Sequence, residues 1–102
     1  MKLLDEDKII DLAELYKIFG DSTRIKIINI LIDNELCVNQ ISEKTNVSQS
    51  AISHQLRILR ENKVIKARRE GQNIIYSLDD EHIMQIVNLV KIHVQEEEEN
   101  GK

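Results

Sequence analysis

The sequence predicts a winged helix-turn-helix domain with the element order α-α-α-α-β-β-α, assembled as a homodimer. Four stretches with helical apolar spacing come first, two strand-like segments around a glycine follow, and a long amphipathic stretch comes last. A chain of 102 residues has room for one small core, which a core shared with a second copy would stabilise materially. We expect residues 1–97 to form this single domain and residues 98–102 to be a disordered tail.

The first two helices are expected before residue 33. Residues 5–19 carry apolar side chains at helical spacing, and Gly20 ends that stretch. Asp21 or Ser22 can cap the second helix, because short oxygen-bearing side chains satisfy the free amides at a helix start. The second helix contains IKIINILI, which is apolar on most sides, so we expect it to be the buried centre of the domain.

The next two helices are expected to form a helix-turn-helix. Val38 and Ile41 predict a short third helix that ends near Thr45, and Asn46 suits the turn because asparagine tolerates left-handed geometry. Ser48 can cap a longer fourth helix. The apolar residues of that helix recur at positions i, i+4 and i+7 and are Ile52, Leu56 and Leu59.

The opposite face of the fourth helix is expected to contact DNA. Its side chains have the length and hydrogen-bonding groups to reach base edges and phosphates in a major groove. They are Gln49, Ser50, Ser53, His54 and Arg57. For His54, a packing role or simple exposure is the alternative.

The charge of the chain is distributed in favour of this interpretation. Residues 48–72 hold six basic and two acidic side chains, a net +4, although the whole chain carries −4. Charges beyond a Debye length of about 8 Å are largely screened, so a basic segment can engage phosphates on an acidic protein. A solvated face on which bases cluster by chance is the alternative.

A hairpin and a last helix complete the predicted fold. KVIKARR and NIIYSL flank Gly71, which can take the positive φ of a tight turn. A basic hairpin directly after a recognition helix is a wing, from which Arg68 and Arg69 would reach neighbouring phosphates or the minor groove. The last helix is expected to begin near Asp79 and to run to about residue 97.

The recognition helix and wing lie in VSQSAISHQLRILRENKVIKARREGQNIIYSLDD, and GDSTRIKII and ELCVNQIS open the second and third helices. In this order the three segments resemble the ArsR/SmtB family of metalloregulatory repressors, with a similarity over roughly residues 10–96. The resemblance implies an obligate dimer, built from the first and last helices, that represses efflux or detoxification genes. Ser22 departs from the proline usual at the first helical position of the family, and it should keep the cap while losing some rigidity.

The resemblance also implies a zinc site on the last helix. The family's zinc-sensing pattern is an Asp-x-His pair followed by a His and then a Glu or His three residues on. The matching residues are Asp80, His82, His93 and Glu96. Two imidazoles and two carboxylates suit zinc or cobalt as the regulatory ligand, whereas surface histidines beside an acidic tail are the alternative. Another site of the family uses paired cysteines, but Cys37 stands alone, so we expect it to be a small half-buried core residue.

One helix cannot close such a site. His82 and His93 are eleven residues apart, so they share a face to within about 20° but are separated by about 16 Å along the axis. Zinc needs its ligands at about 2 Å. Two antiparallel copies can bring one copy's Asp80 and His82 to His93 and Glu96 of the partner subunit, which gives two equivalent sites by symmetry.

The resemblance implies one further contact. In the zinc-sensing relatives the second ring nitrogen of a ligand histidine bonds a backbone carbonyl at the end of the recognition helix. Carried over to this chain, His93 would bond the carbonyl of Lys63, a contact that orients the imidazole and relays metal binding to the DNA-binding helix.

Other functions stay open beside the zinc-responsive repressor. The chain could be a winged-helix regulator with another inducer such as nickel, or a zinc-binding interaction module that never binds DNA. An enzyme is not expected, because zinc catalysis needs an open coordination position and no nucleophile and base are paired in the sequence. A cytoplasmic protein is expected, because the start MKLLDEDKII is too acidic for a signal peptide and the single cysteine fits a reducing compartment.

Overall fold

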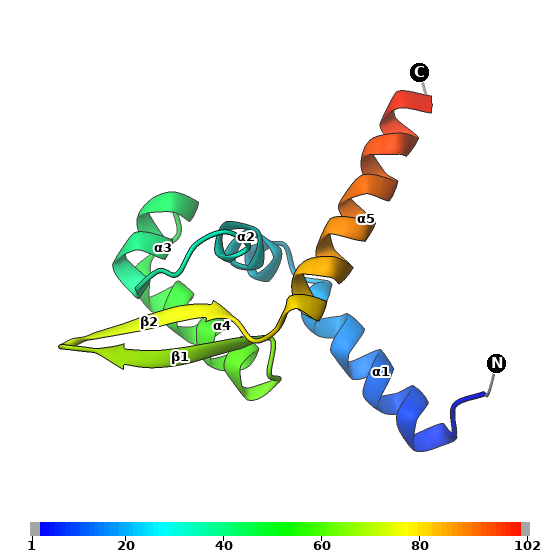
Figure 1. Ribbon diagram of the computed structural model, residues 1–102, viewed down its shortest axis with the longest axis horizontal. Coiled ribbons are helices and arrows are strands. Elements are labelled where there is room, and N and C mark those ends of the chain that lie inside the picture. The colour runs from blue at the N-terminus through cyan, green and yellow to red at the C-terminus, as the bar shows by residue number, and fades with distance from the viewer. Residues whose placement is uncertain (1–2, 101–102) are drawn as a thin grey trace.

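The structure is a computed structural model that describes residues 3–100. These residues form α1 (Glu6–Phe19), α2 (Ser22–Leu31), α3 (Val38–Thr45), α4 (Gln49–Glu61), β1 (Ile65–Glu70), β2 (Asn73–Leu78) and α5 (Glu81–Asn100). The predicted element order is confirmed. Figure 1 shows α2, α3, α4 and the hairpin gathered together, while α1 and α5 extend away from them. Among residues 3–100, none of the helices combines the length and the apolarity that a bilayer crossing needs.

Side-chain caps start the central helices where the sequence predicts them. The Asp21 carboxylate accepts a hydrogen bond from the backbone of Arg24 at 3.1 Å, and the Ser48 hydroxyl accepts one from the backbone of Ala51 at 3.3 Å. Each oxygen satisfies an amide that the first turn of a helix leaves unpaired. Of the two candidate caps for α2, Asp21 takes the role, and the helix therefore begins at Ser22.

Three positions among residues 3–100 have positive φ, and they make the turns around α3, α4 and the hairpin. Asn46, with φ 59°, ends α3 in the left-handed conformation, and Gly71, with φ 64°, lies in the hairpin turn, both as predicted. Lys63, also with φ 59°, follows α4, and its left-handed conformation is not predicted from the sequence. Its N–H donates to the Arg60 carbonyl at 3.0 Å, and the next N–H donates to the Leu59 carbonyl at 2.9 Å. This pair of bonds is the Schellman ending of a helix.

The hairpin is attached to the loop that leads into α3. Strands β1 and β2 pair antiparallel, with a register that runs from Ile65 opposite Leu78 to Glu70 opposite Asn73. Tyr76 of β2 also exchanges two backbone hydrogen bonds with Leu36, at 3.0 and 2.8 Å. The hairpin is therefore held from its second side by backbone pairing, which a free two-stranded hairpin lacks.

The core lies between α2, α4 and the base of the hairpin. The fully buried large side chains are Ile27, Ile28, Ile41, Ile52, Leu56, Leu59, Ile65 and Val64. The predicted stripe of α4 is among them, and so are two residues of α2, which confirms α2 as a buried helix of the domain centre. Burial of one face of α4 leaves its other face directed away from the core.

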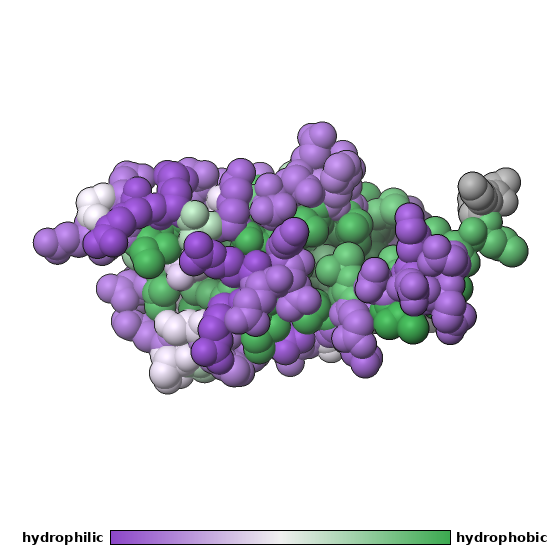
Figure 2. Space-filling model, turned by 90° about the horizontal axis from the view of Figure 1, so that it is seen from below, coloured by the Kyte–Doolittle hydropathy of each residue, from purple (hydrophilic) through white to green (hydrophobic). Residues whose placement is uncertain are grey.

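The helices α1 and α5 lie largely outside this core. No residue of α1 is buried, and Tyr16 of α1 and Leu89 and Val90 of α5 are 64%, 70% and 57% exposed. In Figure 2, green apolar surface lies between purple polar side chains over the half that carries α1, whereas the hairpin end is mostly purple. A single protomer thus leaves two apolar helix faces in contact with water.

The ends of α5 differ from the expected ones. The helix begins at Glu81 rather than near Asp79, because the Asp80 carboxylate accepts a hydrogen bond from the His82 backbone at 2.9 Å and so caps the first turn. It continues to Asn100, past the expected end near residue 97, because glutamine and glutamate are good helix formers and no glycine or proline occurs between Glu81 and Asn100. The predicted tail therefore begins within α5. Its disorder in solution stays a prediction, and residues 101 and 102 lie outside the described residues.

Replacing Leu56 with alanine is expected to lower the free energy of unfolding by about 2 to 5 kcal/mol, because a fully buried leucine leaves both lost apolar contact and a cavity. Its exposed neighbour gives the control: Arg57→Ala is expected to change stability by less than about 0.5 kcal/mol. Urea denaturation followed by circular dichroism at one fixed protein concentration measures both. Equal midpoints for the two variants would contradict the placement of α4.

Candidate nucleic-acid interface and metal ligands

The face of α4 opposite the core is polar and open to solvent. Every predicted contact residue on this helix is exposed, and they are Gln49, Ser50, Ser53, His54 and Arg57. Because the buried stripe holds α4 from the other side, Ser50, Ser53, His54 and Arg57 project from one rigid surface. Gln49 lies in line with Leu56 and is exposed at the first residue of the helix. His54 is exposed like the others, and its role as a DNA contact stays a prediction.

A hydrogen bond between α2 and α4 adds to the apolar packing. The Arg24 Nε donates to the Gln55 Oε1 at 2.9 Å in a half-buried setting. This bond joins the start of α2 to the flank of the exposed face, 31 positions apart in the sequence. The sequence carries no local signal for it, because Arg24 and Gln55 each look like an ordinary polar residue on an amphipathic helix.

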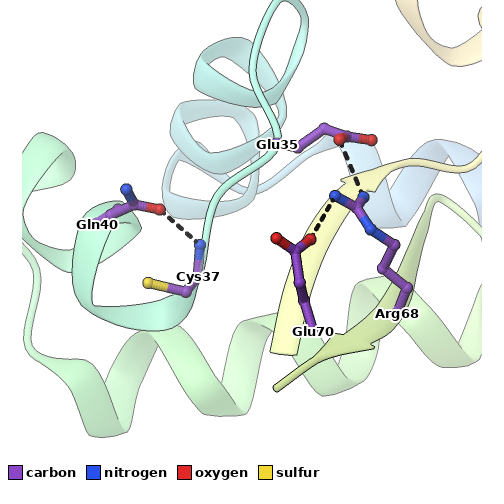
Figure 3. Close-up of polar contacts among 5 residues, drawn as sticks. All are labelled: Glu35, Cys37, Gln40, Arg68 and Glu70. Carbon is purple, nitrogen blue, oxygen red and sulfur yellow. Dashed lines mark hydrogen bonds and ion pairs between the residues drawn. The ribbon is translucent and has the colours of Figure 1, made fainter. Parts of the chain in front are cut away.

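The two wing arginines differ in their surroundings. Arg68 lies between two carboxylates, with 2.9 Å from its Nη1 to Glu35 and 3.0 Å from its Nη2 to Glu70 (Figure 3). The hydrogen bonds to Glu70 and then to Glu35 raise the pKa of the Arg68 guanidinium, which is charged at any ordinary pH. Arg69 points along the turn instead, and its Nε donates to the Gly71 carbonyl at 3.3 Å. Both arginines are exposed.

Cys37 lies at the start of α3, two residues after Glu35 (Figure 3). It is half-buried, as expected, and its backbone N–H donates to the Gln40 Oε1 at 3.0 Å. Gln40 thus closes the first turn of α3 from within the helix, because it fills the glutamine position of a capping box. The thiol has no second cysteine with which to share a soft metal ion.

The four candidate metal ligands lie in two groups along α5. Asp80 and His82 share the start of the helix, with 3.4 Å between Asp80 Oδ1 and His82 Nδ1, while His93 and Glu96 lie far along it. All four are exposed. Within residues 3–100 of one protomer, no three His, Cys, Asp or Glu side chains come together as a metal site requires.

The histidines lie on the same face of α5 as two of its exposed apolar side chains. Ile86, Leu89 and His93 follow His82 by 4, 7 and 11 residues, a spacing that returns to one side of a helix. Leu89 is 70% exposed on this stripe. Whatever covers the apolar stripe must therefore also lie beside both imidazoles. The set of two imidazoles and two carboxylates fits zinc chemically, provided that a second helix brings the two groups together.

The predicted contact between His93 and Lys63 is not made within one protomer, since no hydrogen bond joins them among residues 3–100. Lys63 is nevertheless exposed and ends α4 in the left-handed conformation described above. The relay therefore stays a prediction about the dimer.

Known proteins resemble this chain over most of its length. The family described as "Bacterial regulatory protein, arsR family" matches residues 21–66, from the cap of α2 into β1. A Transcriptional repressor SmtB homolog from Synechocystis is 39% identical over 93% of this chain and 72% of its own length. A Cadmium resistance transcriptional regulatory protein CadC homolog from Staphylococcus aureus is 38% identical over 93% of this chain and 79% of its own.

A solved structure gives the same architecture. It is a Mycobacterium bovis fragment described as a homodimeric winged helix-turn-helix DNA-binding domain, with a TM-score of 0.83 and 23% identity. The match covers 94% of this chain and 92% of that one. At this identity the likeness shows the fold, and the predicted winged helix-turn-helix is confirmed.

Replacing Arg57 with alanine is expected to weaken binding to random-sequence duplex DNA and to reduce the slope of log K against log salt concentration by about 1, because one phosphate contact and its counterion release are lost. Fluorescence anisotropy of a labelled duplex over a sodium chloride series measures the slope. Lys8→Ala is the matched control, since it removes one exposed positive charge from the start of α1. The same slope for both variants would place the DNA contact elsewhere.

Proposed function

Because the chain belongs to the ArsR family of bacterial regulatory proteins, we propose that it is a homodimeric repressor that binds operator DNA without metal and is released by zinc. Members of this family are DNA-binding transcriptional regulators, which confirms the prediction that the chain is not an enzyme. The metal ion, the ligand residues and the regulated genes are the part that we propose.

The proposed DNA contacts are made by the exposed face of α4 and by the wing. In a dimer the two copies of α4 enter successive major grooves about one helical turn apart, and Gln49, Ser53 and Arg57 reach bases and phosphates. Arg68 and Arg69 place positive charge beside the neighbouring backbone. The exposure of these side chains and the net +4 of residues 48–72 support this arrangement.

The observation that carries the regulatory proposal is the exposed stripe of α5. Monomeric proteins seldom leave large apolar patches in water, and Ile86 and Leu89 of the stripe are exposed together with further apolar residues of α5 and of α1. A second copy of the chain, packed through α1 and α5, would cover both. A second copy in this position agrees with the small core of a 102-residue chain and with the dimeric state named for the Mycobacterium bovis domain.

The same stripe supports the proposed metal site. An antiparallel partner helix would bring Asp80 and His82 at the start of one α5 to His93 and Glu96 of the partner subunit, on the face that the stripe already requires to be covered. Zinc, when bound there, supplies a crosslink that fixes the relative angle of the two helices. The second ring N–H of His93 then donates a hydrogen bond to the Lys63 carbonyl at the end of α4. This bond orients the paired α5 helices and the recognition helix together.

The alternative is the same regulator with a different inducing metal. The Staphylococcus aureus relative is named for cadmium resistance, and cadmium prefers thiolate ligands. This chain offers Cys37 as its single thiol, whereas the α5 ligands are nitrogen and oxygen donors. The donor set therefore favours zinc, or cobalt in its place, in a regulator that acts in the cytoplasm.

Zinc is expected to lower the affinity of the protein for DNA from upstream of its own gene by about 5- to 150-fold, the usual range of coupling between two sites. Glu96→Ala is expected to reduce this effect, whereas Glu97→Ala, which removes the neighbouring exposed carboxylate, is the matched control. Anisotropy with and without zinc measures the DNA affinity, and sedimentation of the free protein measures its oligomeric state. A monomer that takes up its full complement of zinc would overturn the proposal.

Replacing His93 with asparagine tests the relay separately. The variant is expected to retain zinc through the remaining ligands, with weaker affinity, and to lose most of the zinc effect on DNA binding, because the link to the Lys63 carbonyl is removed. Calorimetry reports zinc binding, and anisotropy reports the coupling. An unchanged zinc response would show that His93 does not transmit the signal.

A further inference from the structure

The ion-pair cluster on the wing brings two negative charges to a predicted DNA-binding residue. The Arg68 guanidinium contacts Glu35 at 2.9 Å and Glu70 at 3.0 Å, from two different segments of the chain (Figure 3). The side chains of Arg68, Glu35 and Glu70 are 49%, 54% and 65% exposed. All three therefore meet the solvent in which a DNA backbone would lie.

The cluster lies where the isolated bridge of Leu36 to Tyr76 adjoins the two-stranded wing. Arg68 stands on β1 opposite Ile75 of β2, and Tyr76 of β2 pairs with Leu36, the residue after Glu35. The Arg68 side chain thus reaches over β2 to the loop that leads into α3. Glu35 approaches the wing from this loop, while Glu70 stands next to the hairpin turn.

The hairpin does not need these ion pairs for its position. Six residue pairs join β1 to β2, and the Leu36 and Tyr76 backbones exchange two hydrogen bonds. Exposed ion pairs add little to stability, because water and salt screen them and two long side chains lose freedom. A structural role alone therefore gives little reason for two carboxylates at one guanidinium.

The electrostatic effect on DNA is larger. Strand β1 carries Lys66, Arg68 and Arg69 as its basic residues, and the cluster of one arginine with two glutamates has a net charge of −1. A phosphate that approaches Arg68 must displace a carboxylate or lie close to two of them. Non-specific DNA affinity arises almost entirely from neutralised phosphates, so it falls with each positive charge that is already neutralised within the protein.

We propose that Glu35 and Glu70 limit the DNA affinity of the wing by holding the Arg68 guanidinium away from the phosphate backbone. This inference rests on the proposed DNA contact of the wing. The two glutamates weaken binding to all sequences through the same electrostatic term, so they keep non-specific binding low while the base contacts of α4 select the operator. They thus set the overall DNA affinity of the wing, and they do so through Arg68.

Neutralising Glu35 tests the proposal. Glu35→Gln is expected to tighten binding to random-sequence duplex DNA about fivefold at 0.15 M salt and to make the slope of log K against log salt steeper by about 0.9, as one additional phosphate contact does. Glu70→Gln is expected to act in the same direction. Unchanged or weaker binding by both variants would overturn the proposal. Ion pairs that only stabilise the wing would give that result, because their loss does not tighten DNA binding.

Two controls separate the cluster from net charge. Glu14→Gln removes an exposed carboxylate that pairs with Lys17 at 3.3 Å on α1, and it is expected to leave the slope unchanged. In an Arg68→Gln background, Glu35→Gln is expected to lose most of its effect, because the glutamate acts through the arginine. A full effect in that background would overturn the role of Arg68. Thermal unfolding midpoints verify that each variant is folded.

The unaltered protein distinguishes this inference from the proposed function. If it binds no DNA with salt-dependent affinity, the proposed function fails and the inference fails with it. If it binds DNA and the two glutamate variants bind no tighter, the repressor proposal stands and the restraint by Glu35 and Glu70 is rejected.

Discussion

Burial of one stripe on α4 determines what the rest of the molecule can present to DNA. Ile52, Leu56 and Leu59 are almost completely removed from solvent against α2 and the base of the hairpin. Rotation of α4 about its axis would expose these side chains, at a cost comparable with the whole stability of a small domain. Polar side chains on the opposite face, among them Ser53, His54 and Arg57, are therefore directed outward by the packing of α4.

The same small core explains why the chain depends on more than one copy. Among residues 3–100, eleven buried apolar residues form the core, and most of them come from α2, α4 and the hairpin base. The long helices at both ends contribute little: α5 buries Ile83 in its first turn, and α1 buries no residue. The apolar faces of α1 and α5 lack a cover, and the two ligand pairs of α5 lie too far apart to bind one metal ion. The proposed antiparallel partner would cover the faces and bring the ligand pairs together.

Local patterns in the sequence predicted much of this structure. The cap at Ser48, the left-handed Asn46 and the turn at Gly71 follow from residue chemistry within a few positions, and each is found as expected. The stripe of α4 follows from helical periodicity. The expected end of α5 near residue 97 is too early, because the acidic residues that follow have a high helix propensity.

Contacts between distant segments were beyond prediction. Glu35 and Arg68 are 33 positions apart, Arg24 and Gln55 are 31 apart, and nothing near any of them in the sequence indicates its partner. The left-handed Lys63 was also missed, since lysine carries no preference for that conformation. The metal ligands are a different case. The distance that decides whether they bind one ion lies between the α5 helices of two chains, and neither the sequence nor one protomer gives it.

The exposure of α1 bears on how readily proteases in a cell attack this end of the chain. Every side chain from residue 3 to residue 14 is open to solvent, so this end of the chain has few contacts to protect its backbone. If the second copy supplies the missing cover, amide exchange and protease attack at α1 become functions of concentration, because dissociation uncovers the helix. Newly made chains would then persist only once enough of them have accumulated to pair, and degradation of unpaired copies would set a floor for the amount of active protein.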